Sequence, residues 1–106
     1  MSNYPTAQQR RNLKGQALAS DISNFQNVHV QNLSGSPLPL EFWAHHFCAQ
    51  VKSSNGGWYT VVLMANAYGK VTWHSCTCPD GQEGNKCKHQ CALFYLLVEP
   101  FFKADQ

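Results

Sequence analysis

The pattern of apolar and polar positions changes its period along the chain, from helical at the start to alternating in the middle. Between residue 6 and about residue 22, apolar side chains recur at the spacing of one amphipathic helix: Leu13, Ala17, Leu18 and Ile22. Gly15 interrupts this predicted helix. Val28 and Val30 then alternate with polar residues, which predicts a short strand, and residues 35–39 have the Gly and Pro content of a turn or linker.

The middle of the chain has the composition of an antiparallel sheet. Residues 42–52 are rich in aromatic side chains, and residues 58–64 are rich in β-branched and aromatic ones. Residues 53–57 and 66–70 carry the Asn and Gly that tight turns prefer. With a third strand at residues 71–76, this region is predicted to form a three-stranded antiparallel meander.

A long apolar run follows and predicts a helix from about Lys88 to Val98, because Pro100 disfavours helical geometry at the residue before it. The run is apolar almost all round. The helix is therefore expected to be buried on more than one side, or to offer a face to a partner. Together these elements predict an α+β fold, with an N-terminal helix, a small antiparallel meander and a C-terminal helix.

Four residues of metal-binding type lie between the last predicted strand and this helix, as C-x-C, eight residues, then C-x-H: Cys76, Cys78, Cys87 and His89. Three thiolates and one imidazole form the donor set of a closed, four-coordinate structural zinc site. The spacer contains two glycines and a proline, so it can bend the two ligand pairs onto one metal. One structural Zn²⁺ is therefore the predicted cofactor.

The spacing also predicts how the chain must bend at this site. Residues two apart on a strand point the same way but lie about 6.6 Å apart, whereas two sulfurs on one zinc need about 3.8 Å. The strand should therefore bend after Cys78, where Pro79 cannot continue the ladder. Because residues two apart on a helix do not face each other, Cys87 should lie before the first regular turn and the helix should begin close to His89.

This arrangement resembles the SWIM-type zinc finger, in which C-x-C and C-x-H flank a variable spacer ahead of a hydrophobic helix. The likeness is carried by residues 59–61, 71–73, 75–80 and 87–93, and it covers roughly residues 58–98. By position, the resemblance assigns the zinc ligands to Cys76 and Cys78 in the first pair and to Cys87 and His89 in the second. It implies binding to DNA or to a protein. Residues 1–40 are poorly covered and are expected to form the N-terminal helix and a connecting segment.

Composition narrows the setting of the site. A chain of 106 residues is expected to form a single small domain, residues 1–106. The N-terminal residues lack the apolar stretch of a secretory signal, so secretion is not expected. No run of the sequence approaches the ~18 apolar residues of a membrane span. The five cysteines are therefore expected in a reducing, intracellular compartment, where such clusters bind metal more often than they form disulfides. No membrane partner is expected.

The partner is predicted to be a protein, a nucleic acid, or both. A net charge of +2 is too mild to indicate nucleic acid by itself. The candidate phosphate contacts are Arg10, Arg11, Lys14, Lys86 and Lys88. For the three on the N-terminal helix a solvated helix face is the plainer explanation, and the two lysines beside Cys87 should also offset the charge of the metal site. A protein partner is suggested by the apolar helix and by Phe101 and Phe102 beyond it.

Two further residues, Cys91 and His74, are alternative candidates for a role at the metal site, and a third cysteine lies elsewhere. Cys91 is interpreted as a small buried helix residue, with replacement of His89 as its alternative role. His74 is interpreted as an ordinary strand histidine, with a role near or on the metal as its alternative. Cys48 is expected in the strand core. The alternative function is a redox switch in which the ligands and Cys91 release zinc on oxidation.

An enzyme is not expected, because four good ligands leave no open position on the metal. The sequence patterns of zinc deaminases, phosphate-binding glycine loops and the G-x-S-x-G elbow are also absent. No small-molecule substrate is expected either. The sequence therefore predicts a zinc-stabilised interaction module.

Overall fold

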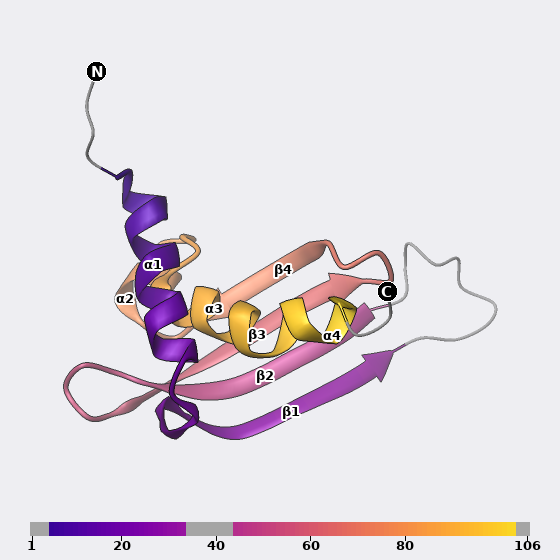
Figure 1. Cartoon of the computed structure of the whole chain (residues 1–106), viewed down its shortest axis with the longest axis horizontal. Coiled ribbons are helices and arrows are strands. Elements are labelled where there is room, and N and C mark those ends of the chain that lie inside the picture. Colours follow the sequence, from indigo (N-terminus) through magenta and orange to yellow (C-terminus); the bar gives the residue numbers. More distant parts are fainter. Residues whose placement is uncertain (1–4, 34–43, 104–106) are drawn as a thin grey trace.

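A computed structural model describes residues 5–33 and 44–103 of the chain. Its strands form one antiparallel sheet in chain order: β1 (Phe25–Leu33), β2 (Ala44–Lys52), β3 (Trp58–Asn66) and β4 (Val71–Cys76). The helices are α1 (Ala7–Ala19), α2 (Pro79–Gln82), α3 (Lys88–Leu93) and α4 (Glu99–Lys103), with a 3-10 turn at Ile22–Asn24 and a π turn at Phe94–Val98. The α+β class is confirmed (Figure 1).

The sheet contains one strand more than the predicted meander. The short strand expected at Val28 and Val30 is a nine-residue strand, β1, that pairs with β2. Its register shifts between Gln26 and His29, where Asn27 has a φ of 54°. This is the geometry of a bulge, and the bulge interrupts the alternation that would have marked the whole strand in the sequence. The turn expected at residues 35–39 lies outside the described residues.

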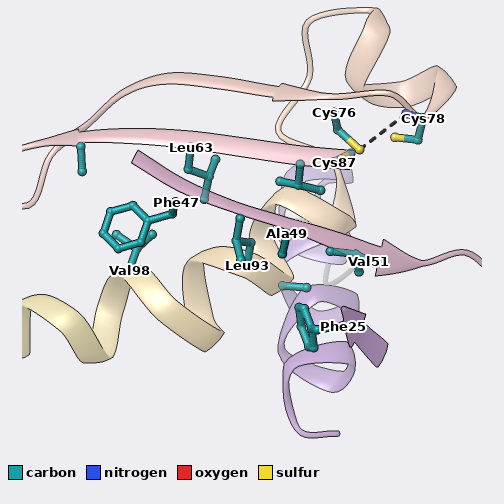
Figure 2. Packing of buried hydrophobic residues seen from close by; sticks show 13 residues of the cluster. Phe25, Phe47, Ala49, Val51, Leu63, Cys76, Cys78, Cys87, Leu93 and Val98 are labelled. Carbon is teal, nitrogen blue, oxygen red and sulfur yellow. Dashed lines mark hydrogen bonds between the residues drawn. The ribbon is translucent and has the colours of Figure 1, made fainter. Parts of the chain in front are cut away.

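One face of the sheet carries the core. Side chains on β2 and β3 alternate, and the buried set is Phe47, Ala49, Val51, Val61, Leu63 and Ala65. These residues pack against Leu93 and Val98 of the C-terminal helix, as Figure 2 shows for most of them. Cys48 points to the other face and is half-buried, so its expected place in the strand core was wrong. Side chains alternate between the two faces of a strand, so Cys48 lies on the face opposite to its neighbours Phe47 and Ala49.

The C-terminal helix, residues 88–103, continues past the predicted end at Val98. It consists of α3, the π turn and α4, and Pro100 lies inside α4. The wide π turn directly before α4 accommodates a residue that lacks an N–H. Phe101 then packs edge-to-face on Phe47 and Phe102 packs against it at a tilt, with ring centroids 5.4 and 6.4 Å away. Both rings are half-buried against the core at this end of the sheet, so only part of each remains exposed to a partner.

The N-terminal helix forms, but of the predicted apolar face only Leu18 packs against the core. Thr6 caps α1, accepting a hydrogen bond from the backbone of Gln9, whose side chain bonds back to the Thr6 N–H. Leu13 and Ile22 remain 59% and 68% exposed. Gly15 instead is buried against α3, where an added Cβ would lie 2.8 Å from the backbone nitrogen of Ala92.

The backbones of α1 and α3 therefore approach each other closely where the two helices cross. The crossing lies at Gly15, the residue that was expected to interrupt the N-terminal helix. In Figure 1, α1 lies across the end of the sheet where α2 and α3 begin. None of the helices in the described part of the chain is long and apolar enough to span a bilayer.

Candidate metal centre

The four predicted ligands meet in one buried cluster. The ligand atoms of Cys76, Cys78, Cys87 and His89 all lie within 4.8 Å of one another. The Nδ1 atom of His89 lies 3.9 Å from the sulfurs of both Cys76 and Cys87. A tetrahedral zinc with bonds of about 2.3 Å to sulfur and about 2.0 Å to nitrogen places its ligand atoms roughly 3.5–3.8 Å apart. The donor set and its spacing therefore fit one zinc ion, bound through Nδ1.

The ends of three elements bring these ligands together, as the spacing predicted. β4 ends at Cys76, and Cys78 is the N-cap of α2 with Pro79 in its first turn. Cys87 is the N-cap of α3, so it lies just outside the regular helix while His89 lies in its first turn. The chain turns at Pro79 as predicted, although β4 already ends at Cys76, and the predicted helix start close to His89 is confirmed. The spacer, expected as a loop, contains the short helix α2.

Backbone N–H groups orient the sulfurs. Cys78 donates its N–H to the Cys76 sulfur at 3.5 Å, drawn as the dashed line in Figure 2. Gly81 donates its N–H to the Cys78 sulfur at 3.2 Å. A Cβ on Gly81 would lie 2.8 Å from the carbonyl oxygen of Cys76, so only glycine fits here. Such hydrogen bonds stabilise thiolates and fix their direction toward the metal.

A comparison with family models matches residues 59–97 to the SWIM zinc finger. This match includes β3, β4, α2 and α3, and with them all four clustered ligands. The chain contains a SWIM zinc finger. Neither a curated protein nor a solved structure matches the chain. α1, β1 and β2 lie outside the matched segment of the SWIM finger.

Packing three thiols together in the SWIM finger separates their pKa values. The hydrogen bond from the Cys76 thiol lowers the pKa of Cys87 to about 4, against the opposing effect of burial. The same hydrogen bond raises the pKa of Cys76 far above its ordinary value, and burial raises the pKa of Cys78. Three thiolates repel one another in this site unless a cation shares it. A divalent metal ion supplies that charge, and one Zn²⁺ with three thiolates gives the metal site a formal charge of about −1.

The other ring nitrogen of His89, Nε2, is buried and has no hydrogen-bond partner among the described residues. The ring of Tyr59 lies against the imidazole, with centroids 5.0 Å apart. Metal-bound histidines usually donate their second N–H to an oxygen acceptor. In this SWIM finger, packing against an aromatic ring holds the imidazole instead.

Neither alternative ligand belongs to the cluster. Among the described residues, the cluster contains neither His74 nor Cys91. The Cys91 thiol donates to Asn12 Oδ1 at 3.1 Å, and burial raises its pKa to about 11. It is a packed residue on α3, as the plainer interpretation held, and little of it is thiolate at neutral pH. This weakens the redox-switch alternative, which needed a reactive spare cysteine.

An ion pair joins α1 to the SWIM finger. The Arg11 guanidinium donates Nε and Nη2 to the two carboxylate oxygens of Asp80, at 2.8 and 2.9 Å. Asp80 lies in the first turn of α2, directly after Cys78 and Pro79. The hydrogen bond from Arg11 lowers the pKa of Asp80. The sequence offered Arg11 as a phosphate contact, and its partner Asp80 was missed because the two lie far apart in the chain.

Four of the five candidate phosphate contacts gather around one cleft beside the metal centre. This cleft, which we call the basic cleft, has a volume of about 450 Å³ and runs between α1, the β2–β3 turn and the finger. Among the residues that line it are Arg10, Arg11, Lys14 and Lys88, together with Ser53, Ser54, Tyr59 and Asp80. Lys86 does not line it. A neighbouring hollow shares Lys14 and Lys88 and adds Lys52, which the sequence gave no reason to select.

Proposed function

We propose that the protein is a binding module that contacts nucleic acid through the basic cleft, with zinc in a structural role. The observation that carries the proposal is the convergence of Arg10, Lys14 and Lys88 on one concave surface beside the metal centre. Phosphate contacts of this kind supply most of the sequence-independent affinity for nucleic acid. A mild net charge is compatible with such binding when the cations gather on one surface.

The local charge of the cleft supports this proposal. Among the described residues, the ion pairs are Arg11 with Asp80 and Lys103 with Glu99. The remaining cleft cations therefore have no carboxylate partner there, although Arg10 also donates to the Pro5 carbonyl. They outnumber the single negative charge of the zinc–thiolate cluster. Lys52 extends the positive surface into the neighbouring hollow.

The structural role of zinc follows from the donor set. Four protein ligands complete a tetrahedral site and leave no position for water or substrate, which catalytic zinc requires. The ligands also come from the C-terminal end of β4 and from the N-terminus of α3, so one metal ion connects these two elements and crosslinks the fold. We infer that the protein is not an enzyme of the zinc-hydrolase kind.

Fluorescence anisotropy with labelled single-stranded DNA, duplex DNA and RNA tests the nucleic-acid proposal. Binding should be measurable at about 50 mM salt and should weaken steeply by about 200 mM. Lys14→Glu should abolish it, and Lys14→Gln should reduce the salt slope by about one unit. Lys70→Glu is the matched control, because Lys70 is an exposed lysine in the β3–β4 turn. Equal losses in both Glu variants, or no binding at low salt, would contradict the proposal.

Binding of a protein partner is the second candidate. It is favoured by the sheet face opposite the core, where Trp58 and Trp73 are 37% and 44% exposed. Exposed tryptophans are enriched in protein interfaces. Affinity capture with the zinc-loaded protein, followed by nuclease treatment, separates the candidates. Protein that stays bound after nuclease and is lost with Trp73→Ser would favour this second function.

A further inference from the structure

The sheet face opposite the core carries two exposed tryptophans. Strand pairing and the alternation of side chains assign six residues to it, which together we call the open face: Gln50, Trp58, Thr60, Val62, Met64 and Trp73. None of the six is buried. In Figure 1 the C-terminal helix passes in front of the sheet, on the core side, so the open face is turned away from the viewer. The C-terminal helix therefore leaves the open face uncovered.

The two tryptophans mark the ends of this face. Trp58 is the first residue of β3, and Trp73 on β4 lies opposite Met64, further along β3. At ~3.3 Å per residue, these two positions lie roughly 20 Å apart. Thr60 and Val62, which lie between them, have short side chains that leave space for planar rings on the sheet. Stacked nucleotides follow one another at ~3.4 Å, so about six nucleotides of a strand cover this distance.

The charges around the open face complement a polyanion. Within the described residues, none of the four strands carries a carboxylate, and the acidic residues lie in the helical segments or their caps: Asp21, Asp80, Glu83 and Glu99. Lys52 on β2 lies opposite Trp58 and lines the hollow that also contains Lys14 and Lys88. Tyr59, the residue after Trp58, lines the basic cleft itself. One end of the open face therefore adjoins the cations to which we assign phosphate contacts.

Exposed aromatic rings beside cations favour a nucleic acid whose bases are unpaired. Indole rings stack on the faces of bases, and every base has such a face. In a duplex those faces are already stacked on neighbouring base pairs, whereas a single strand leaves them free. A protein partner fits the open face less well, because the centre of a protein interface is depleted in polar groups. Gln50 and Thr60 place polar groups directly beside the Trp58 end of the face.

We propose that the open face binds single-stranded nucleic acid, with bases stacked on Trp58 and Trp73 and the backbone continuing past Lys52 toward the basic cleft. This inference rests on the proposed function, because the cleft supplies the phosphate contacts. It adds a preference for single strands over duplexes. Recognition by stacking tolerates many base sequences, because it uses ring faces and not base edges.

Fluorescence anisotropy with an abasic strand separates stacking from phosphate contacts. The probes are a labelled DNA strand of about twelve nucleotides, an abasic strand of the same length and charge, and the matching duplex, all at about 50 mM salt. The strand with bases should bind the zinc-loaded protein about 10-fold more tightly than the abasic strand, and more tightly than the duplex. Trp58→Ser and Trp73→Ser should each weaken binding of the strand with bases by about 5-fold or more and leave the abasic strand unaffected.

Tyr68→Ser is the matched control, because Tyr68 is an aromatic residue of the β3–β4 turn that is 69% exposed and lies outside the open face. This variant should bind both strands as the natural protein does. Nuclear magnetic resonance of the natural ¹⁵N-labelled protein gives a second measurement that does not depend on how well a variant folds. The indole N–H signals of Trp58 and Trp73, assigned by their loss in each variant, should shift saturably with the strand that has bases and remain in place with the abasic strand.

The possible outcomes separate this inference from the proposed function. If the strand binds and Lys14→Glu abolishes binding, but the indole signals stay in place and neither tryptophan variant matters, the cleft proposal stands and stacking on the open face is refuted. If no nucleic acid binds at low salt, both proposals fail. If a captured protein shifts the indole signals and the strand does not, the open face is a protein interface and the inference is overturned.

Discussion

The SWIM finger and α1 border the same basic cleft, but different forces hold them there. The finger's ligands meet in a buried cluster that a metal ion crosslinks. α1 is held by close packing at Gly15 and by the Arg11–Asp80 pair. Structural zinc contributes on the order of 10–16 kcal/mol in zinc-finger peptides, far more than an exposed ion pair. The cleft thus has one rigid wall and one wall that is attached more weakly.

Loss of a zinc ligand should have the largest effect, because it removes the crosslink of the rigid wall. Cys87→Ser should lose the metal and most of the folded structure, since zinc binding and folding are coupled. A strong chelator should do the same to the natural protein. Elemental analysis should give about one zinc per chain before these changes and far less afterwards, and circular dichroism should report the unfolding.

Cys48→Ser is the matched control for this prediction. Cys48 lies on β2 outside the ligand cluster and points away from the core. Its variant should keep both zinc and fold. A folded, zinc-replete Cys87→Ser protein would refute the ligand assignment.

Gly15→Ala should have the next largest effect and should act on the weaker wall. In an exposed helix, this change stabilises by about 1 kcal/mol. Here the new methyl group would meet the backbone of α3, so the variant should be less stable by about 1–3 kcal/mol, the usual cost of overpacking. Thermal unfolding measures the sign directly, and the zinc content should stay at one per chain.

Gly57→Ala serves as the control for the change at Gly15. An added Cβ at Gly57 would meet its neighbours at ordinary contact distances of 3.6 Å. Its stability should change little. A Gly15→Ala protein that is more stable than the natural one would show that α1 does not approach α3 as closely as described.

The same contrast explains what the sequence could predict. Metal ligands are restricted to a few residue types at short spacings, so Cys76, Cys78, Cys87 and His89 could be assigned from the sequence. The turn after Cys78 followed from bond lengths, and the start of α3 close to His89 followed from the spacing of side chains on a helix. α1 buries Gly15, and of the apolar residues that the spacing selected on it only Leu18 packs against the core, so the spacing predicted the buried face only in part. A hydrophobic pattern predicts only contacts that apolar side chains make.

Contacts between distant segments could not be predicted either. The Arg11–Asp80 pair joins residues 69 positions apart, and the close approach of Gly15 to Ala92 joins α1 to the distant helix α3. The predicted end of the C-terminal helix at Val98 was wrong because it too depended on a contact between distant segments. Pro100 disfavours a helix locally, but the burial of Phe101 and Phe102 against Phe47 favours its continuation. Tertiary packing decided the outcome.

Asp80→Asn should have the smallest effect and should test whether the ion pair positions α1. The variant loses the charge-assisted bidentate contact to Arg11, while its side chain keeps a polar group near Asn85. Hydrogen exchange should become faster along α1, and zinc should stay bound. Because the pair is partly exposed, the difference from the natural protein should shrink at high salt.

Glu83→Gln is the control for the change at Asp80, because it removes one negative charge from an exposed residue that directly follows α2. Exchange along α1 should not change in this variant. If Asp80→Asn and Glu83→Gln behave alike, charge near the finger matters in general and the specific pair does not hold α1. If Asp80→Asn also releases zinc, the two walls of the cleft are not independent, because Asp80 then supports the metal site as well as the helix.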